Sequence, residues 1–290
     1  VFQRDTKDML GPGLDFPDMF GASAPQTNNA SMRNRGWELS LNYRGEIGSV
    51  INYSIGGSLS DATAEVTEYS NPTGTNPAGN WYEGRKVGEI WGYRASGIIQ
   101  TQEEADEYNA KYNLSYLTGK AWEPGDVKYI DLNGDNKIDR GDNNLNNMGD
   151  LTIIGNTTPR YQYTFNGSIS YKDLSLSMMF QGVAKRDWDP GTAPYFWGSG
   201  AYAQVTVFNE HMDYWREDNK DAYYPKPYIH SAGGVGPFRN KTMQTSDRYL
   251  QSGAYCRLKN ITLSYNLPTS WVQKAGLQKV QVFFSGETLL

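Results

Sequence analysis

The chain has 290 residues, of which 38% are hydrophobic, and it is rich in aromatic residues and glycine, with 21 Tyr, 8 Trp and 31 Gly. Its net charge of −5, without a basic stripe, argues against a nucleic-acid partner. A single cysteine, Cys256, excludes an intrachain disulfide framework, and no apolar run reaches the roughly 18 residues of a transmembrane helix. Cys256 lies in a strand pattern, so we expect a small buried hydrophobe.

Residues 36–60 alternate between apolar and polar side chains and predict an amphipathic hairpin, with strands at 36–44 and 50–61 and a short turn at 45–49. The apolar face of the hairpin consists of Trp37, Leu39, Leu41, Tyr43, Ile51, Tyr53, Ile55 and Leu59.

Residues 1–4 resemble the end of a further strand, and the last residues stop inside another strand pattern. We therefore expect a fragment of a longer polypeptide.

Residues 125–142 contain the most specific pattern in the chain. Side-chain oxygens recur at positions 1, 3, 5, 9 and 12 of a twelve-residue loop, and position 7 can contribute its main-chain carbonyl. This spacing can arrange oxygen ligands around one hard cation and therefore predicts a structural calcium site. The predicted ligands are Asp131, Asn133, Asp135, Lys137, Asp139 and Asp142.

The loop departs from an EF-hand at two positions. Asn136 replaces the usual Gly at position 6, although Asn tolerates the positive φ of the turn. Asp142 replaces the longer Glu at position 12, which predicts modest affinity. Ile138 can anchor the loop to a core, and 127–130 predicts a strand rather than an EF-hand helix. The alternative is a solvated acidic turn that binds no metal, since its carboxylates repel one another.

Two more hairpins follow the loop. The first has strands at 159–171 and 174–184 around a turn at Lys172-Asp173, and the second has strands at 254–267 and 279–290 around 268–278. The connections between hairpins are long, at 5–34, 62–157 and 185–253. Short turns that alternate with long loops, together with aromatic residues near strand ends, are typical of transmembrane β-barrels.

The strand order constrains the long connections. If the short turns are periplasmic, 62–157 begins and ends outside the membrane. The apolar run at 87–99 is then extracellular structure rather than a lone membrane strand, as is the calcium loop, and 102–112 predicts one exposed helix. A soluble β-sandwich is the competing fold, because alternation alone does not separate the two. Loops above about 12–15 residues are uncommon in compact domains and favour the barrel.

The motifs, taken together, resemble the C-terminal part of the SusC/RagA family of TonB-dependent outer-membrane transporters, over nearly the whole chain. Each motif is weak alone, but seven occur in the family's order. The matching stretches are 4–10 (RDTKDML), 34–39 (NRGWEL), 83–98 (EG…GEIWGY…GI), 125–135 (GDVKYIDLNGD), 154–159 (IGN…P), 255–265 (YCRLKNITLSY) and 284–287 (FSGE).

The resemblance implies an all-β fold, in which residues 1–290 form part of a large antiparallel transmembrane barrel of a Gram-negative outer membrane. In this family the barrel is plugged by an N-terminal domain that this chain lacks. A SusD-like surface lipoprotein acts as a lid, and the TonB complex supplies energy through the plug. The implied function is the import of oligomers, with oligosaccharides favoured over peptides. Outer-membrane lipid would surround the barrel. The calcium loop would then stiffen an extracellular segment.

The connection at 185–253 is dense in aromatic residues. Exposed aromatic rings can stack on sugar rings or pack against a partner protein, whereas buried ones would stabilise the loop itself. Substrate contact, lipoprotein contact and packing within the loop are therefore three alternative roles for these residues. The residues are Trp188, Tyr195, Phe196, Trp197, Tyr202, Trp215, Tyr223 and Tyr224.

Two other functions compete with import. A secreted, calcium-stabilised glycan-binding β-sandwich module would share the aromatic residues and the calcium turn. A glycoside hydrolase would need two opposed carboxylates in a cleft, but the 32 acidic residues offer no pair that stands out. No Ser-His-Asp spacing or zinc ligand set is visible either. We therefore expect no enzymatic activity.

Overall fold

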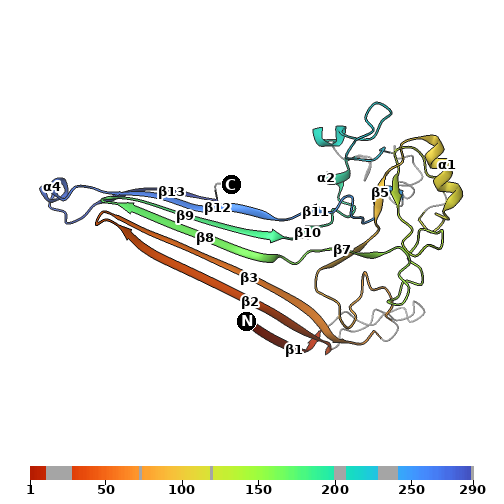
Figure 1. Ribbon diagram of the computed structural model, residues 1–290, viewed down its shortest axis with the longest axis horizontal. Coiled ribbons are helices and arrows are strands. Elements are labelled where there is room, and N and C mark those ends of the chain that lie inside the picture. Colours follow the sequence, from red (N-terminus) through yellow and green to blue (C-terminus); the bar gives the residue numbers. More distant parts are fainter. Residues whose placement is uncertain (11–27, 72–73, 118–119, 199–206, 228–240, 289–290) are drawn as a thin grey trace.

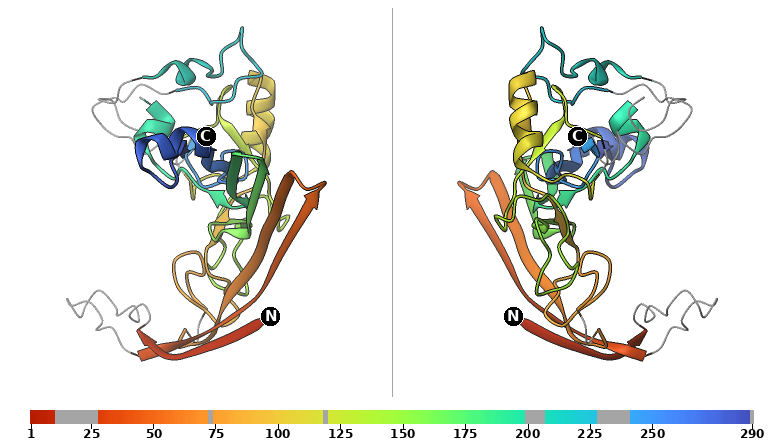
Figure 2. Two further views of the ribbon diagram at one scale, coloured as in Figure 1. Left: turned by 90° about the vertical axis from the view of Figure 1, so that its left-hand side faces the viewer. Right: turned by 90° about the vertical axis from the view of Figure 1, so that its right-hand side faces the viewer.

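The computed structural model describes residues 1–10, 28–71, 74–117, 120–198, 207–227 and 241–288. Its main feature is a seven-stranded sheet, in the order β1-β2-β3-β8-β9-β12-β13, in which all neighbours are antiparallel. The sheet follows a curved arc with β1 and β13 at its edges (Figures 1 and 2). The strands are β1 (Phe2–Leu10), β2 (Asn28–Ile47), β3 (Ile51–Tyr69), β8 (Arg160–Tyr171), β9 (Leu174–Lys185), β12 (Tyr255–Asn266) and β13 (Gln281–Glu287).

The short connections lie at one end of the sheet and the long ones gather at the other (Figure 1). Residues 48–50 join β2 to β3, and Lys172-Asp173 join β8 to β9, with Lys172 at a positive φ of 52°. The β12–β13 connection contains α4 (Thr269–Val272) and the 3₁₀ helix η4 (Gln273–Ala275). The predicted alternation of short turns and long connections is confirmed.

One face of the sheet carries rows of apolar side chains in direct cross-strand register. Many of them are exposed, up to 73% for Phe284, and no described residue forms a second layer over them. Apolar area left in water is unfavourable by about 25 cal/mol per Å², so this face requires an apolar environment. Two rows of register partners run Tyr53–Ile169–Leu176–Leu263–Phe284 and Ile51–Tyr171–Leu174–Tyr265–Val282.

The opposite face is polar and is linked by side-chain hydrogen bonds across strands. The hydroxyl oxygens of Ser54 and Ser168 lie 2.7 Å apart. Gly56 lets two amide side chains meet over its backbone, because a Cβ there would lie 2.3 Å from Oδ1 of Asn42 and 2.8 Å from Nδ2 of Asn166. A sheet with one apolar and one polar face follows directly from the alternation in the sequence.

The strand bounds correct two predictions. β2 starts at Asn28 and β1 runs to Leu10, so the predicted connection at 5–34 is too long. β3 continues to Tyr69, so the next connection starts beyond position 62. The extra strand residues, which include Arg33, Arg35, Glu65 and Glu68, are too polar to show a membrane-type alternation.

The fold prediction is confirmed as a mostly antiparallel β fold with long connections at one end. Within the described residues, the sheets besides the seven-stranded one are three two-stranded ribbons. No second large sheet is therefore available among them to bury the apolar face, and the β-sandwich alternative is not favoured. The arc formed by these strands is open, and no closed barrel is seen.

The long connections fold into short, paired elements. The apolar run at 87–99 forms two short strands rather than one long strand. The strand pairs are β4 (Glu89–Gly92) with β7 (Thr152–Asn156), β5 (Ala95–Ile98) with β6 (Val127–Tyr129), and β10 (Asp187–Trp188) with β11 (Gln251–Ser252).

The predicted exposed helix is present as α1 (Gln102–Lys111). Thr101 caps it, with its side-chain oxygen accepting a hydrogen bond from the Glu104 amide at 3.2 Å. Two short helices follow in the second long connection, α2 (Pro194–Trp197) and the 3₁₀ helix η3 (Asn209–Met212). In the described part of the chain, no helix is both long and apolar enough to cross a membrane.

Both long connections contribute to one hydrophobic core beside the end of the sheet. Trp122 and Ile99 from the first connection are fully buried, and Trp197 and Tyr249 from the second pack in the same cluster. Each fully buried side chain of this size contributes about 1.5–3 kcal/mol. The two connections therefore form a single folded unit, which we call the loop unit and define as 70–159 together with 186–254.

Cys256 corrects a further prediction, because its side chain is exposed rather than buried. It pairs in register with Gly182, which in turn faces Tyr163. This position lies on the uncovered apolar face of the single-layer sheet. A small hydrophobe in a strand pattern is buried only where a second layer covers it.

Candidate functional site

An aromatic cluster in the loop unit joins β10, α2, residues 213–224 and Tyr249. Trp197 lies at its base, with its ring 4.8 Å from Tyr249 and 4.9 Å from Phe196, both edge-on. Tyr223 and Tyr224 meet at 4.9 Å in the same edge-on arrangement. Edge-to-face contacts at these distances add about 0.5–1.5 kcal/mol each beyond the area they bury.

The aromatic residues that were grouped from the sequence differ in how deeply the structure buries them. Trp197 and Trp215 are buried, and Phe196 and Tyr224 are half-buried within the cluster. Trp188 and Tyr195 stack almost parallel, with 6.1 Å between ring centroids and 14° between planes, and both remain exposed. Tyr223 is also exposed. Tyr202 lies outside the described residues.

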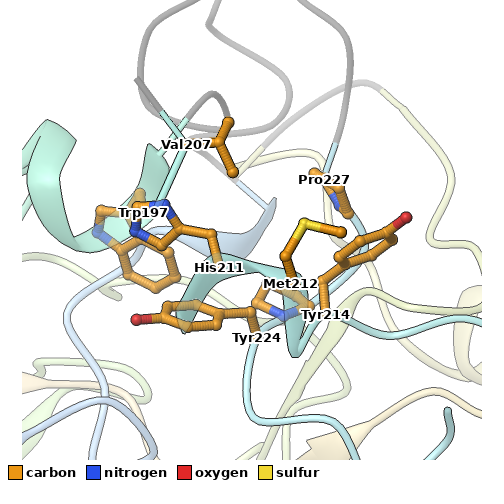
Figure 3. Close-up of a pocket in the computed structure, with 8 residues that line it drawn as sticks. Trp197, Val207, His211, Met212, Tyr214, Tyr224 and Pro227 are labelled. Atoms are coloured by element: carbon orange, nitrogen blue, oxygen red, sulfur yellow. The ribbon is translucent and has the colours of Figure 1, made fainter. Parts of the chain in front are cut away.

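A pocket of about 250 Å³ opens beside this cluster (Figure 3). Its wall is mostly apolar and comes from the end of α2, from η3 and its neighbours, and from the segment after Tyr223. The residues that line it are Trp197, Val207, His211, Met212, Tyr214, Tyr224, Pro225 and Pro227.

Local hydrogen bonds hold the pocket wall in place. Tyr214 and Tyr224 form a bridge, in which the Trp215 amide donates to the Tyr224 carbonyl and the Tyr224 amide donates to the Asp213 carbonyl, both at 2.9 Å. The Trp197 indole N–H donates to the Gly191 carbonyl at 2.7 Å. The wall is therefore fixed by the backbone as well as by packing.

His211 connects the two sides of the pocket. Its Nδ1 accepts a hydrogen bond from the Phe208 amide at 3.1 Å, which places the ring proton on Nε2 in the neutral form. Nε2 then donates to the Tyr195 carbonyl at 3.0 Å, and the ring lies edge-on to Tyr224 at 5.6 Å. Both ring nitrogens of His211 are therefore used within the protein.

Sequence reasoning missed six of the eight residues that line the pocket. His211, Met212, Tyr214 and the two prolines lie in a stretch without helix or strand periodicity, so no pattern placed them near Trp197. The only available signal was the density of aromatic residues and prolines at 214–227. Burial raises the pKa of the Tyr224 hydroxyl, with smaller contributions from Tyr223, Glu210 and Asp213, so its ring stays neutral.

A buried ion pair ties the second long connection to the first. Nζ of Lys241 lies 3.0 Å from Oδ2 of Asp126, and the two side chains are 3% and 0% exposed. The same ammonium group lies 5.5 Å from the centre of the Trp122 ring and donates to the Ala121 carbonyl. A buried charge that lost its partner would be strongly destabilising, so this pair holds the two connections together.

The predicted calcium loop has two of its expected features. Asn136, at position 6, has a positive φ of 61°, and Ile138, at position 8, is fully buried in the core of the loop unit. Asp150, which the sequence did not single out, is fully buried beside the loop. Its two oxygens accept from the Leu132 amide at 2.7 Å and the Asp139 amide at 2.9 Å.

The carboxylates of the loop are turned toward backbone amides in this conformation. Asp131 accepts from the Gly134 amide at 2.6 Å and from the Asn136 amide at 2.9 Å. Asp135 and Asp139 each accept from the amide two residues further on. Within the described residues, no three acidic, histidine or cysteine side chains converge as a metal site would require. Calcium binding stays a prediction.

Comparison with known proteins identifies relatives of this chain among TonB-dependent receptors. No family model matches the chain. It is 27% identical over 298 residues to TonB-dependent receptor P3 of Formosa agariphila, covering 98% of this chain and 26% of the relative. TonB-dependent receptor P26 of the same organism is 24% identical and matches the whole chain.

The fold agrees with solved structures. The chain is similar to a chain of the RagAB peptide transporter, with a TM-score of 0.63, 20% identity and 99% of this chain covered. It is similar to the RagAB peptide importer in its open-open state, with a TM-score of 0.65 and 21% identity. The predicted resemblance to TonB-dependent receptors of the SusC/RagA type is confirmed.

The chain matches only part of the length of these proteins. The chain spans about a quarter of the length of its TonB-dependent receptor relatives and just over a quarter of the RagAB chains, which are covered to 29% and 28%. The seven strands therefore correspond to one arc of a larger TonB-dependent receptor fold. The relatives named above are receptors and transporters rather than enzymes.

Proposed function

We propose that this chain forms part of the barrel wall and extracellular surface of an outer-membrane importer in a Gram-negative bacterium. The observation that carries the proposal is the single-layer sheet, whose exposed apolar face is joined at one end to a folded loop unit. The importer takes up oligomeric nutrients, either oligosaccharides or peptides. The similarity to TonB-dependent receptors, which extends over 98% and 100% of this chain for the two relatives named, supports this proposal.

The dimensions of the apolar face agree with a membrane position. Tyr161 and Tyr171, both exposed, bound the apolar side chains of β8 near its two ends. At about 3.3 Å per residue, this part of the strand is about 33 Å long. A tilt of about 40° reduces its height to about 25 Å, which is the height of the apolar band of an outer-membrane barrel.

The polar face would line the passage for the nutrient. Its small hydroxyl and amide side chains, such as Asn42, Ser168 and Thr262, keep the surface hydrophilic without filling the space in front of it. The two solved structures named above are titled peptide transporter and peptide importer. This supports import as the activity and makes peptides one of two substrate classes for this chain.

The proposal includes two partners and a metal ion. A SusD-like surface lipoprotein would cover the extracellular end, and the TonB complex would act through a plug domain outside this chain. We propose calcium as a structural ion at 131–142, supported by the spacing of oxygen ligands and by the backbone of Asn136. Transport rather than catalysis is the proposed activity, and we assign no catalytic residue.

Extraction and uptake test this function together. Tagged at its native locus and extracted from outer membranes in mild detergent, the protein is expected as a polypeptide of about four times this length, together with a surface lipoprotein. Deleting the gene should abolish uptake of a fluorescently labelled oligosaccharide or peptide, as should deleting the TonB gene. A soluble species of about this chain's size, or unchanged uptake of every probe, would refute the proposal.

A further inference from the structure

We propose that the pocket beside Trp197, Tyr214 and Tyr224 is a subsite for one apolar side chain of a peptide. This inference rests on the proposed import function and narrows its substrate class, because it favours peptides over oligosaccharides. It follows from the size of the pocket, from the chemistry of its wall and from the hydrogen bonds that its polar atoms already make.

The size of the pocket suits a single side chain. Its volume is about 250 Å³, whereas pockets that enclose a drug-sized ligand hold about 300–1,000 Å³. The wall presents rings and aliphatic surface from Trp197, Tyr224, Pro227 and Met212 (Figure 3). Grooves lined by aromatic side chains are a recurrent means of binding apolar and proline-containing peptide segments.

Few polar side-chain groups of the wall are left for a sugar: the hydroxyls of Tyr214 and Tyr224 lie in the wall, but its ring nitrogens are already used. Both nitrogens of His211 are hydrogen-bonded within the protein, and the Trp197 indole N–H is donated to Gly191. The prolines have no N–H, and the amide and carbonyl of Tyr224 are used in its bridge. A sugar ring carries hydroxyl groups around its edge. Each buried hydroxyl without a partner costs roughly 1–3 kcal/mol, whereas an apolar side chain incurs no such loss.

The pocket is preformed and accessible. Trp197 and Tyr224 connect its base to the core of the loop unit, so little ordering is required when a ligand binds. Met212 at its edge is 55% exposed, and Tyr195, to whose carbonyl His211 donates, is 60% exposed. A side chain can therefore enter from solvent and remain surrounded by apolar surface.

Calorimetry on the full-length receptor, extracted in detergent with whatever partner accompanies it, tests the assignment. The probes are the capped peptide Ac-Ser-Gly-Leu-Pro-Gly-Ser-NH₂, the same peptide with Leu and Pro replaced by Ser, and maltohexaose. Met212→Asp places a charge at the edge of the pocket, and Met212→Leu preserves its apolar surface. Tyr116→Asp is the matched control, because Tyr116 is exposed in the same loop unit and does not line the pocket.

We expect the Leu-Pro peptide to bind and the Ser peptide to bind at least tenfold more weakly. Met212→Asp should weaken Leu-Pro binding at least tenfold, whereas Met212→Leu should restore it and Tyr116→Asp should leave it unchanged. Native migration on gels without heating would show that each variant is folded.

The assignment would be overturned if the Leu-Pro peptide did not bind, or if Met212→Asp bound it as tightly as the wild-type receptor. It would also be overturned if maltohexaose displaced the peptide, or if the only effect of Met212→Asp were the loss of a co-purifying lipoprotein. The uptake assay separates failure of the subsite from failure of the import function. If labelled oligomers still enter cells through the receptor while the pocket variants bind normally, only the subsite assignment fails.

Discussion

At the residue scale, four buried tyrosines make the stability of the loop unit depend on pH. Tyr93, Tyr108, Tyr129 and Tyr249 lie in its core, and burial raises the pKa of each hydroxyl above its ordinary value of 10, to about 12 for Tyr249. The folded state therefore keeps four protons that the unfolded state releases above pH 10. Their contribution to stability is fully present below pH 10 and is lost as the pH rises above it.

Alkaline titration followed by phenolate absorbance measures this effect. We expect exposed tyrosines to ionise near pH 10 without loss of structure, and the buried four to ionise later, in one cooperative step that coincides with unfolding of the loop unit. If all tyrosines ionised together near pH 10 while the fold stayed intact, these four would not be buried as described.

The Lys241–Asp126 pair gives a second prediction at this scale. Lys241→Met leaves a buried carboxylate without its cation and should reduce the stability of the loop unit by about 3–5 kcal/mol. The double variant Lys241→Met with Asp126→Asn removes both charges and should be less destabilised than the sum of the single variants. Thermal unfolding followed by tryptophan fluorescence gives the coupling energy. Strictly additive effects would show that the pair is not coupled.

Single residues were predictable where a local rule decides their role. The loop spacing placed Asn136 at a positive φ and Ile138 in a core, because both follow from the geometry of one short turn. Cys256 was predicted wrongly, since its burial depends on whether a second layer covers the sheet. His211 and Met212 acquire their role from distant segments that no local pattern connects.

At the element scale, the two faces of one strand should respond in opposite ways to the same substitution. Met178 lies on the apolar face, opposite Gly167 and Ile261, and its neighbour Ser177 lies on the polar face. Met178→Lys should reduce the stability of the sheet in the membrane by up to about 2–4 kcal/mol. Ser177→Lys, at nearly the same depth, should be tolerated.

The measurement is the heat-dependent gel mobility of the full-length protein across a urea series in lipid. A shift of the Met178→Lys midpoint to lower urea, with Ser177→Lys close to wild type, supports a lipid-facing apolar side. Equal shifts for the two variants would contradict it.

The calcium turn is the element whose prediction awaits a direct test. If 131–142 binds calcium, chelation should lower the midpoint of loop-unit unfolding, and excess calcium should restore it. Asp131→Asn should abolish that response, whereas Asp106→Asn, on the exposed helix α1, should preserve it. An unfolding midpoint indifferent to both chelator and calcium would support the solvated-turn alternative.

Hairpins with clear alternation were predicted to within a few residues, because period-two patterning reports a half-buried strand directly. Most of β1 and the outer parts of β2 and β3 were missed, since polar residues on both faces remove the pattern where a strand extends beyond the apolar band. The small strand pairs of the loop unit depend on partners far along the chain, such as β4 with β7.

At the scale of the whole molecule, we propose that the sheet crosses a membrane with the loop unit outside. The strand order and the positions of the connections support this arrangement (Figure 1). Two exposed positions at opposite ends of the sheet can report it: Tyr116 in the loop unit and Leu277 in the β12–β13 connection. The native Cys256 is replaced by Ser, so that each reporter cysteine is the only one in this part of the receptor.

The most direct test is labelling of Tyr116→Cys and Leu277→Cys in intact cells with a maleimide that does not cross the outer membrane. We expect Tyr116→Cys to react in intact cells and Leu277→Cys to react only after the outer membrane is permeabilised. Equal labelling of both positions in intact cells, or labelling of Leu277→Cys alone, would contradict it.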